Sequence, residues 1–159
     1  TRYSGPRRAL HWTIAATFLG AVGSGIAFGN GADAAFVPHV LLGSATGLLA
    51  VARLVLWAVR PGNTPPRSNA AARVVHWALA LGPVPQLISG IVMLVLADTL
   101  ARIAAGLPPE RTVLSELSPA APHGAVGFAL GALALGHIAL ALWHHYGKGD
   151  RLIARMGRG

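Results

Sequence analysis

The stretch APHGAVGFALGALALGHIALALWHHY, residues 121–146, decides the fold class. It contains no acidic residue, lysine or arginine, and it exceeds the roughly 20 residues that a helix needs to cross the hydrocarbon core of a membrane. Three further long apolar stretches precede it, at about residues 9–29, 36–59 and 72–97. The sequence therefore predicts an all-α membrane protein in which a four-transmembrane-helix bundle forms a single domain over residues 1–159.

The composition excludes several other classes of protein. Hydrophobic residues make up 53% of the chain and charged residues only 11%, which is too apolar for an ordinary soluble domain. No cysteine is present, so disulfides and thiolate-ligated iron centres are excluded. The net charge of +8 would suggest nucleic acid as a partner, but the basic residues flank the apolar stretches. That placement is typical of membrane topology and predicts the lipid bilayer, with no nucleic acid, as the surroundings.

The distribution of charge also predicts the orientation. Most arginines and lysines lie on the side that carries both termini, and only Arg102 and Arg111 lie opposite. The positive-inside rule then places both termini in the cytoplasm. The first span is too long for a cleaved signal and is expected to stay in the protein. The opposite side carries most of the acids, namely Asp33, Asp98, Glu110 and Glu116.

The connections between the spans are short, with one exception. A turn at 29–33 joins the first two spans, and a Pro-rich connector at 60–68 joins the second and third. The exception is the loop 98–120, where a short helix is expected near residues 100–105, before two prolines end it. Pro83 and Pro85 interrupt the backbone hydrogen bonds of the third span and predict a kink there.

Six of the seven histidines fall at the ends or on one face of the spans: His11, His39, His76, His123, His137 and His144. An ionisable side chain in hydrocarbon is costly without a partner, which makes each of them a candidate functional residue. By depth, His11 and His76 lie near the cytoplasmic face, and His39 and His123 near the outer face. His137 follows His123 by fourteen residues, so it lies on the same helix face about 21 Å deeper.

This layering predicts two stacked sites that each hold an iron porphyrin between two imidazoles. His39 with His123 forms the outer site, and His11 with His137 forms the inner one. Pairing His11 with His76 is a geometric alternative for the inner site, and spacing alone does not decide between them. Ligation of iron by two imidazoles leaves no open position, which favours electron transfer over oxygen binding.

The surroundings of these histidines suit a flat macrocycle. Gly43 and Gly127 each lie four residues after an outer histidine, on the same helix face. They could accept a porphyrin ring, or they could simply allow close packing of helices. Arg53 shares the face of His39 and is expected to pair with a propionate of the inner haem, with lipid phosphate as the alternative partner.

Several stretches match the pattern of a known family: residues 8–12, His39 with Gly43, Arg53-Leu54, His76, residues 89–93, His123, His137, residues 144–146 and the tail at 148–150. On these residues the chain resembles the bacterial cytochrome b561 family from end to end, and within that family the superoxide oxidase type. The resemblance implies two b-type haems with the pairings His11–His137 and His39–His123. It also implies a quinone near the cytoplasmic haem, faced by His76 and His144, with Arg67 as a basic loop residue.

The expected function is electron transfer from a periplasmic donor, superoxide first, through two haems to ubiquinone. One alternative is a cytochrome b subunit that anchors a partner dehydrogenase or respiratory complex and accepts its electrons. Another is a permease that uses the histidines to carry Zn²⁺ or protons. His145 is expected to lie at the membrane interface without a role in either site.

Overall fold

The structure is a computed structural model that describes residues 4–59, 70–149 and 152–156. Every regular element in these ranges is helical. The long helices are α1 (Gly5–Gly29), α2 (Phe36–Val59), α3 (Ala70–Leu81) with α4 (Pro83–Leu96), and α7 (Ala120–Leu142). In the described part of the chain, four helical segments are long and apolar enough to cross a membrane. The predicted four spans are therefore confirmed, with the first beginning at Gly5 rather than near residue 9.

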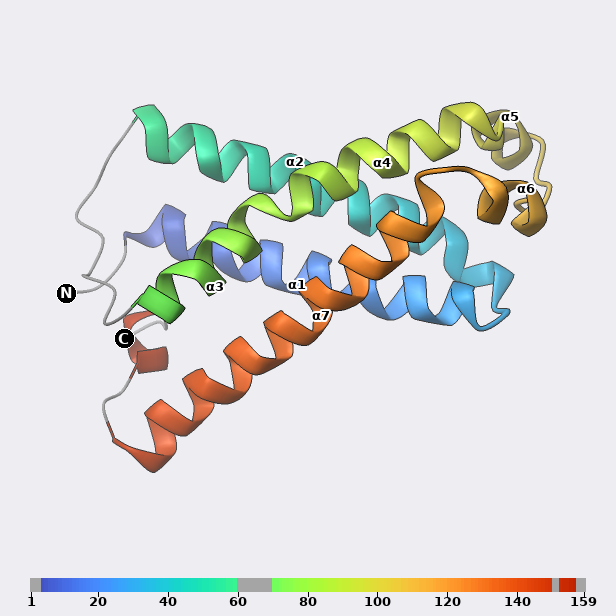
Figure 1. The fold of residues 1–159 in the computed structure, drawn as a ribbon. Coiled ribbons are helices and arrows are strands. Elements are labelled where there is room, and N and C mark those ends of the chain that lie inside the picture. Colours follow the sequence, from blue (N-terminus) through green and yellow to red (C-terminus); the bar gives the residue numbers. More distant parts are fainter. Residues whose placement is uncertain (1–3, 60–69, 150–151, 157–159) are drawn as a thin grey trace.

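The helices run alternately up and down, so that both ends of the described chain lie at one end of the molecule (Figure 1). α1 and α2 form an antiparallel hairpin with the most extensive packing in the structure, and α4 packs on α2. The indole nitrogen of Trp12 donates a hydrogen bond of 2.8 Å to the backbone oxygen of Met156. This bond ties the C-terminal helical turn η3 (Leu152–Arg155) to the beginning of α1.

The predicted turn between the first two spans is present. Asn30 ends α1, and Gly31 follows with a φ of 106°, a conformation that favours glycine because it has no β-carbon. A single 3-10 turn, η1 (Asp33–Ala35), then leads into α2. The chain thus reverses direction within a few residues, which places the beginning of α2 beside the end of α1.

The third span is divided at Gly82, between α3 and α4. Pro83 opens α4, where its missing N–H costs little. A β-carbon at Gly82 would lie 2.6 Å from a methyl group of Leu130, so glycine also allows α7 to approach here. The interruption predicted from Pro83 and Pro85 is confirmed, and it coincides with a helix crossing.

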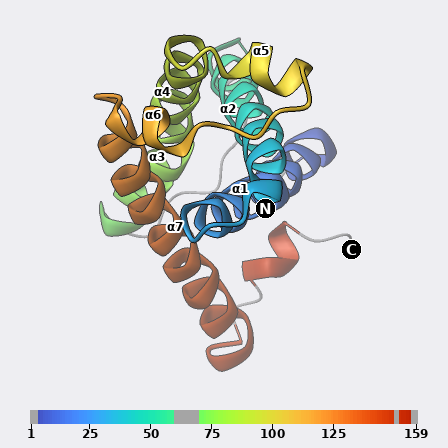
Figure 2. The ribbon, with the colours of Figure 1, turned by 90° about the vertical axis from the view of Figure 1, so that its right-hand side faces the viewer.

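The loop between α4 and α7 holds two short helices at the end opposite the termini (Figures 1 and 2). α5 (Thr99–Ala104) confirms the predicted helix, whereas α6 (Arg111–Glu116) was not predicted. Arg111 fastens α6 to the α1–α2 turn, because its Nε and Nη2 each lie 2.6 Å from Oδ1 of Asp33. The connector at 60–68, with Arg67, lies outside the described residues.

Among the described residues, alanines supply half of the buried apolar positions, and many large apolar side chains point outward. Buried positions in the middle of the helices include Ala21, Ala50, Ala80 and Ala134. Large apolar side chains such as Phe128 are exposed, which suits a surface covered by lipid rather than water. The C-terminal half of α7 diverges from the other helices (Figures 1 and 2). The four-span fold is thus held mainly by α1, α2 and α4, with α7 packed across them.

Candidate functional site

His39 and His123 come together near the end of the bundle opposite the termini. Each lies in the first turns of its helix, His39 in α2 and His123 in α7. Their ring centroids are 6.0 Å apart, with an angle of 82° between the planes. Two imidazoles on opposite sides of one metal ion have centroids roughly 6 Å apart, because each metal–nitrogen bond is about 2 Å long. The spacing would therefore allow both residues to hold the iron of one haem.

The His39 ring is held against α1. Its Nδ1 lies 2.8 Å from the backbone oxygen of Ala21, so the nitrogen carries the proton and donates it. A β-carbon at Gly25 would lie 2.8 Å from both Cε1 and Nδ1 of this ring, so only glycine leaves the ring this room. With Nδ1 engaged, Nε2 is the nitrogen that remains for a metal, as is usual for histidine ligands.

The His123 ring is held against α4. Its Nδ1 lies 2.8 Å from the hydroxyl oxygen of Ser89, and the amide of Gln86 donates to its backbone oxygen at 3.0 Å. A β-carbon at Gly90 would lie 3.5 Å from the ring. The sequence did not predict a role in the site for Ser89, Gln86 or Gly25. Ser89 and Gln86 could have been noticed as polar side chains within an apolar span, which usually have a partner.

Three histidines gather in the half of the bundle nearer the termini. The ring centroids of His76 and His137 are 5.1 Å apart, and Nδ1 of His76 is hydrogen-bonded to the backbone oxygen of Ala72. His11 interacts electrostatically with His137, His76 and Arg53. The two inner pairings predicted from the sequence, His11 with His137 and His11 with His76, thus lie in one cluster. The direct contact between the rings of His76 and His137 matches neither pairing.

Arg53 lies in this cluster, on the face of α2 that was predicted. It is half-buried, and its guanidinium lies 4.7 Å from the centre of the Trp57 ring. It also interacts electrostatically with His11 and His137. A cation beside these imidazoles can stabilise a carboxylate of a bound group.

His144 and His145 lie in a π-helical turn, η2 (Trp143–Gly147). A π-turn contains more residues than an α-turn, so the regular spacing of α7 ends at Leu142. The His144 ring lies against Trp143, with centroids 5.3 Å apart. The buried Nδ1 of His145 has no hydrogen-bond partner among the described residues.

The model of one protein family, described as prokaryotic cytochrome b561, matches residues 2–159. The chain belongs to the prokaryotic cytochrome b561 family. It is therefore a multi-pass bacterial membrane protein that transfers electrons through haem b. The resemblance noted from the sequence is confirmed at the level of the family. No curated protein and no solved structure matches the chain.

The residues of this b561 protein fit a haem at the outer pair. The donor set is two imidazoles with their Nδ1 atoms engaged, and a β-carbon at Gly43 would meet no atom within 4 Å. Gly47 differs, because its β-carbon would lie 2.5 Å from Cβ of Leu87. A β-carbon at Gly127 would lie 3.1 Å from the amide nitrogen of Gln86. Of the two glycines proposed as a cradle, Gly43 has the open face, whereas Gly127 lies beside Gln86. Gly47 instead allows α2 and α4 to pack closely.

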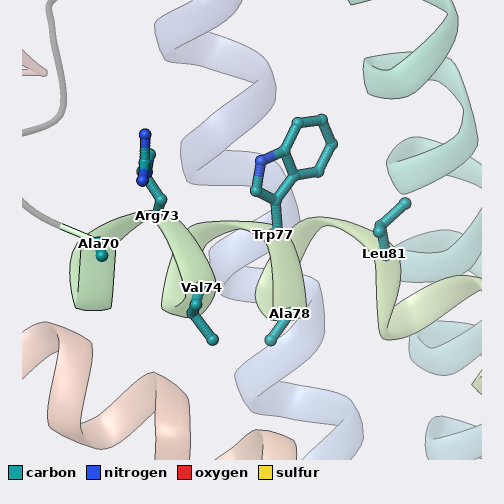
Figure 3. Close-up of a pocket in the computed structure, with 6 residues that line it drawn as sticks. All are labelled: Ala70, Arg73, Val74, Trp77, Ala78 and Leu81. Carbon is teal, nitrogen blue, oxygen red and sulfur yellow. The ribbon is translucent and has the colours of Figure 1, made fainter.

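A shallow hollow of about 630 Å³ lies along one side of α3 (Figure 3). Its lining includes Arg73, Trp77 and Leu81, while His76 belongs to a different face of the same helix. The hollow is thus separate from the imidazole cluster. Within the described ranges, no group of three or more His, Asp or Glu side chains could hold a bare metal ion. Axial ligation of a haem iron requires only two imidazoles.

Proposed function

We propose that the chain carries electrons across the bacterial inner membrane, from an outer donor through two b-type haems to ubiquinone at the cytoplasmic side. The observation that supports this most strongly is the His39–His123 pair, whose rings stand 6.0 Å apart with both Nδ1 atoms engaged. The imidazole cluster in the other half supplies ligands for a second haem. The residues 1–159 act as one domain with both termini in the cytoplasm.

Each residue has a defined role in this proposal. His39 and His123 hold the outer haem, and His11 and His137 hold the inner one. His76 contacts the His137 ring from the side, and it faces the quinone together with His144. Arg53 pairs with a propionate of the inner haem. Haem iron between two imidazoles supplies one-electron oxidation and reduction.

Superoxide is the first candidate for the donor. Two superoxide anions would each give up one electron and leave as oxygen. One ubiquinone would take both electrons and two protons from the cytoplasmic side, and leave as ubiquinol. The chain's own residues would keep water from the haems and orient the quinone near His76.

A second donor, a redox partner protein of a respiratory complex, is favoured by the charges of the outer loop. Arg102 pairs with Glu110 at 2.7 Å, and Arg111 pairs with Asp33 at 2.6 Å. Both arginines of the loop are thus neutralised, and Asp98 and Glu116 add negative charge. A surface of this sign does not steer a small anion towards the haem.

Reconstitution into vesicles with ubiquinone distinguishes the donors. If superoxide is the donor, an enzymatic superoxide source should form ubiquinol, and a haem-free variant should not. If a partner is the donor, superoxide should leave the haems oxidised, and a dehydrogenase should co-purify with the chain. A purified protein without a Soret band would contradict the haem proposal and favour the permease.

The ligand assignment has a separate test, haem quantification in single variants. We expect His123→Ala and His137→Ala each to lose one of two haems, because each removes one axial ligand. His76→Ala should keep both. If His76→Ala instead loses a haem while His137→Ala retains two, the inner ligands are His11 and His76.

A further inference from the structure

Two polar side chains within the apolar third span contact His123. Ser89 and Gln86 belong to α4, and they reach Nδ1 and the backbone oxygen of His123 at 2.8 Å and 3.0 Å. A polar group inside a membrane is costly unless it has a partner, so these contacts require an explanation beyond packing. Both are made to one residue of another helix, which points to the orientation of the His123 ring.

The direction of the hydrogen bond is assigned from the other partner of Ser89. The hydroxyl oxygen also lies 3.1 Å from the backbone oxygen of Gln86, which can only accept, so we assign the single hydroxyl hydrogen to that contact. With this assignment the hydroxyl oxygen accepts from Nδ1–H of His123. In this tautomer Nε2 has no proton, as a metal ligand requires.

The opposite histidine is held in a different way. His39 donates to the backbone oxygen of Ala21, an acceptor that no side-chain substitution removes. His123 instead donates to the side chain of Ser89. Its hydrogen bond can therefore be changed by substitution at one position without altering either axial ligand.

We propose that Ser89 is a positioning residue that selects the tautomer of His123 and lowers the reduction potential of the haem between His39 and His123. The inference rests on the proposed function, since it assumes that these two residues are the outer ligands. Donation from Nδ1–H to an oxygen raises electron density on the imidazole and makes it a stronger ligand. A stronger ligand favours the ferric state, so the hydrogen bond lowers the potential.

The test is a redox titration of the purified holoprotein, followed by visible absorbance, with haem quantification. In Ser89→Ala we expect two haems, with the midpoint potential raised for one and unchanged for the other. Ser89→Thr keeps the hydroxyl and should titrate as the wild type. Thr17→Val is the matched control, because Thr17 bonds carbonyls of its own helix at Thr13 and Ile14.

The affected haem is identified in the His137→Ala background, which should retain only the outer haem. There Ser89→Ala should again raise the single remaining potential. Loss of one haem in Ser89→Ala, with retention in Ser89→Thr, would also support the role of the hydroxyl. If Ser89→Ala keeps two haems and neither potential changes, or both change equally, the role of Ser89 is wrong while the proposed function stands. A wild-type chain without haem would overturn the proposed function and this inference together.

Discussion

At the residue scale, the chain shows how a histidine is fixed within a membrane. Each outer imidazole uses Nδ1 for a hydrogen bond to a neighbouring helix, and each lies beside a glycine of that helix. Gly25 makes room for the His39 ring, whereas a β-carbon at Gly90 would touch the His123 ring at an ordinary contact distance of 3.5 Å. The acceptor four residues before Gly25, or immediately before Gly90, fixes the tautomer of each ring. A nearby acceptor thus orients both rings, and glycine is required only beside His39.

Gly25→Ala tests this arrangement at His39. Its β-carbon would lie 2.8 Å from two ring atoms, so the ring must shift and its hydrogen bond to Ala21 weakens. Loss of one such bond costs about 1 kcal/mol, so we expect the outer haem to be held roughly fivefold less tightly. Haem retention during dilution measures the effect. Gly23→Ala is the control, since its β-carbon would meet nothing within 4 Å; equal haem loss in both variants would contradict the explanation.

At the scale of elements, the contacts of Arg111 join α6 to a distant part of the chain. Arg111 contacts Asp33, donates to the backbone oxygen of Phe28 at 2.5 Å and lies 4.1 Å from the centre of the Phe28 ring. These contacts join the outer loop to the α1–α2 turn. α6 is too short to be stable alone, so its position depends on the contacts of Arg111 together with the burial of Leu114.

Arg111→Gln should therefore loosen the outer loop. Both partners are partly exposed, so we expect a cost on the order of 1 kcal/mol, after screening by solvent. The measurement is the rate at which a protease cleaves the loop at 105–119 in detergent, which should rise several-fold. Arg102→Gln is the comparison, because Arg102 pairs with Glu110 within the same loop. If the cleavage rate rises as much in Arg102→Gln, the contacts of Arg111 with the α1–α2 turn do not hold the loop in place.

The two glycines of α2 provide a second prediction for an element. A β-carbon at Gly47 would lie 2.5 Å from Cβ of Leu87 in α4, whereas one at Gly43 would meet no atom within 4 Å. Gly47→Ala should lower the thermal unfolding midpoint, because α2 and α4 must separate. Gly43→Ala should leave this midpoint of the haem-free protein unchanged. Thermal denaturation of both variants without haem measures the difference, and an equal loss would contradict separate roles for the two glycines.

At the scale of the whole molecule, the up-and-down order of the spans places both ends of the described chain together (Figure 1). The bond from Trp12 to Met156 shows the same closeness. The excess of arginine at this end predicts that it faces the cytoplasm. The loop with α5 and α6 then faces the periplasm.

The absence of cysteine makes this orientation easy to measure. Single variants Ser118→Cys and Ser4→Cys, both at exposed positions, can be labelled in intact spheroplasts with a membrane-impermeant maleimide. We expect labelling of Cys at position 118 and none at position 4, because only the outer loop is accessible. After permeabilisation both should react. Labelling of position 4 alone in intact spheroplasts would reverse the proposed orientation.

The sequence alone determined the features that depend on local composition. Apolar length predicted the four spans, Pro83 the interruption of the third, and depth along the helices the two layers of histidines. These properties follow from a few neighbouring residues and from the cost of polar groups in lipid. The family, too, was identifiable from residues in the sequence, and the match over residues 2–159 confirmed it.

Only the tertiary structure decided which residues meet across helices. Ser89 and His123 are separated by 34 residues, and Arg111 and Asp33 by 78, so no local pattern predicts their contacts. The contact between His76 and His137, and the different surroundings of Gly43 and Gly47, likewise depend on how the helices rotate and cross. Apolar pattern in a membrane shows which residues can lie in lipid, but it does not fix helix rotation, because lipid and helix interior are similarly apolar.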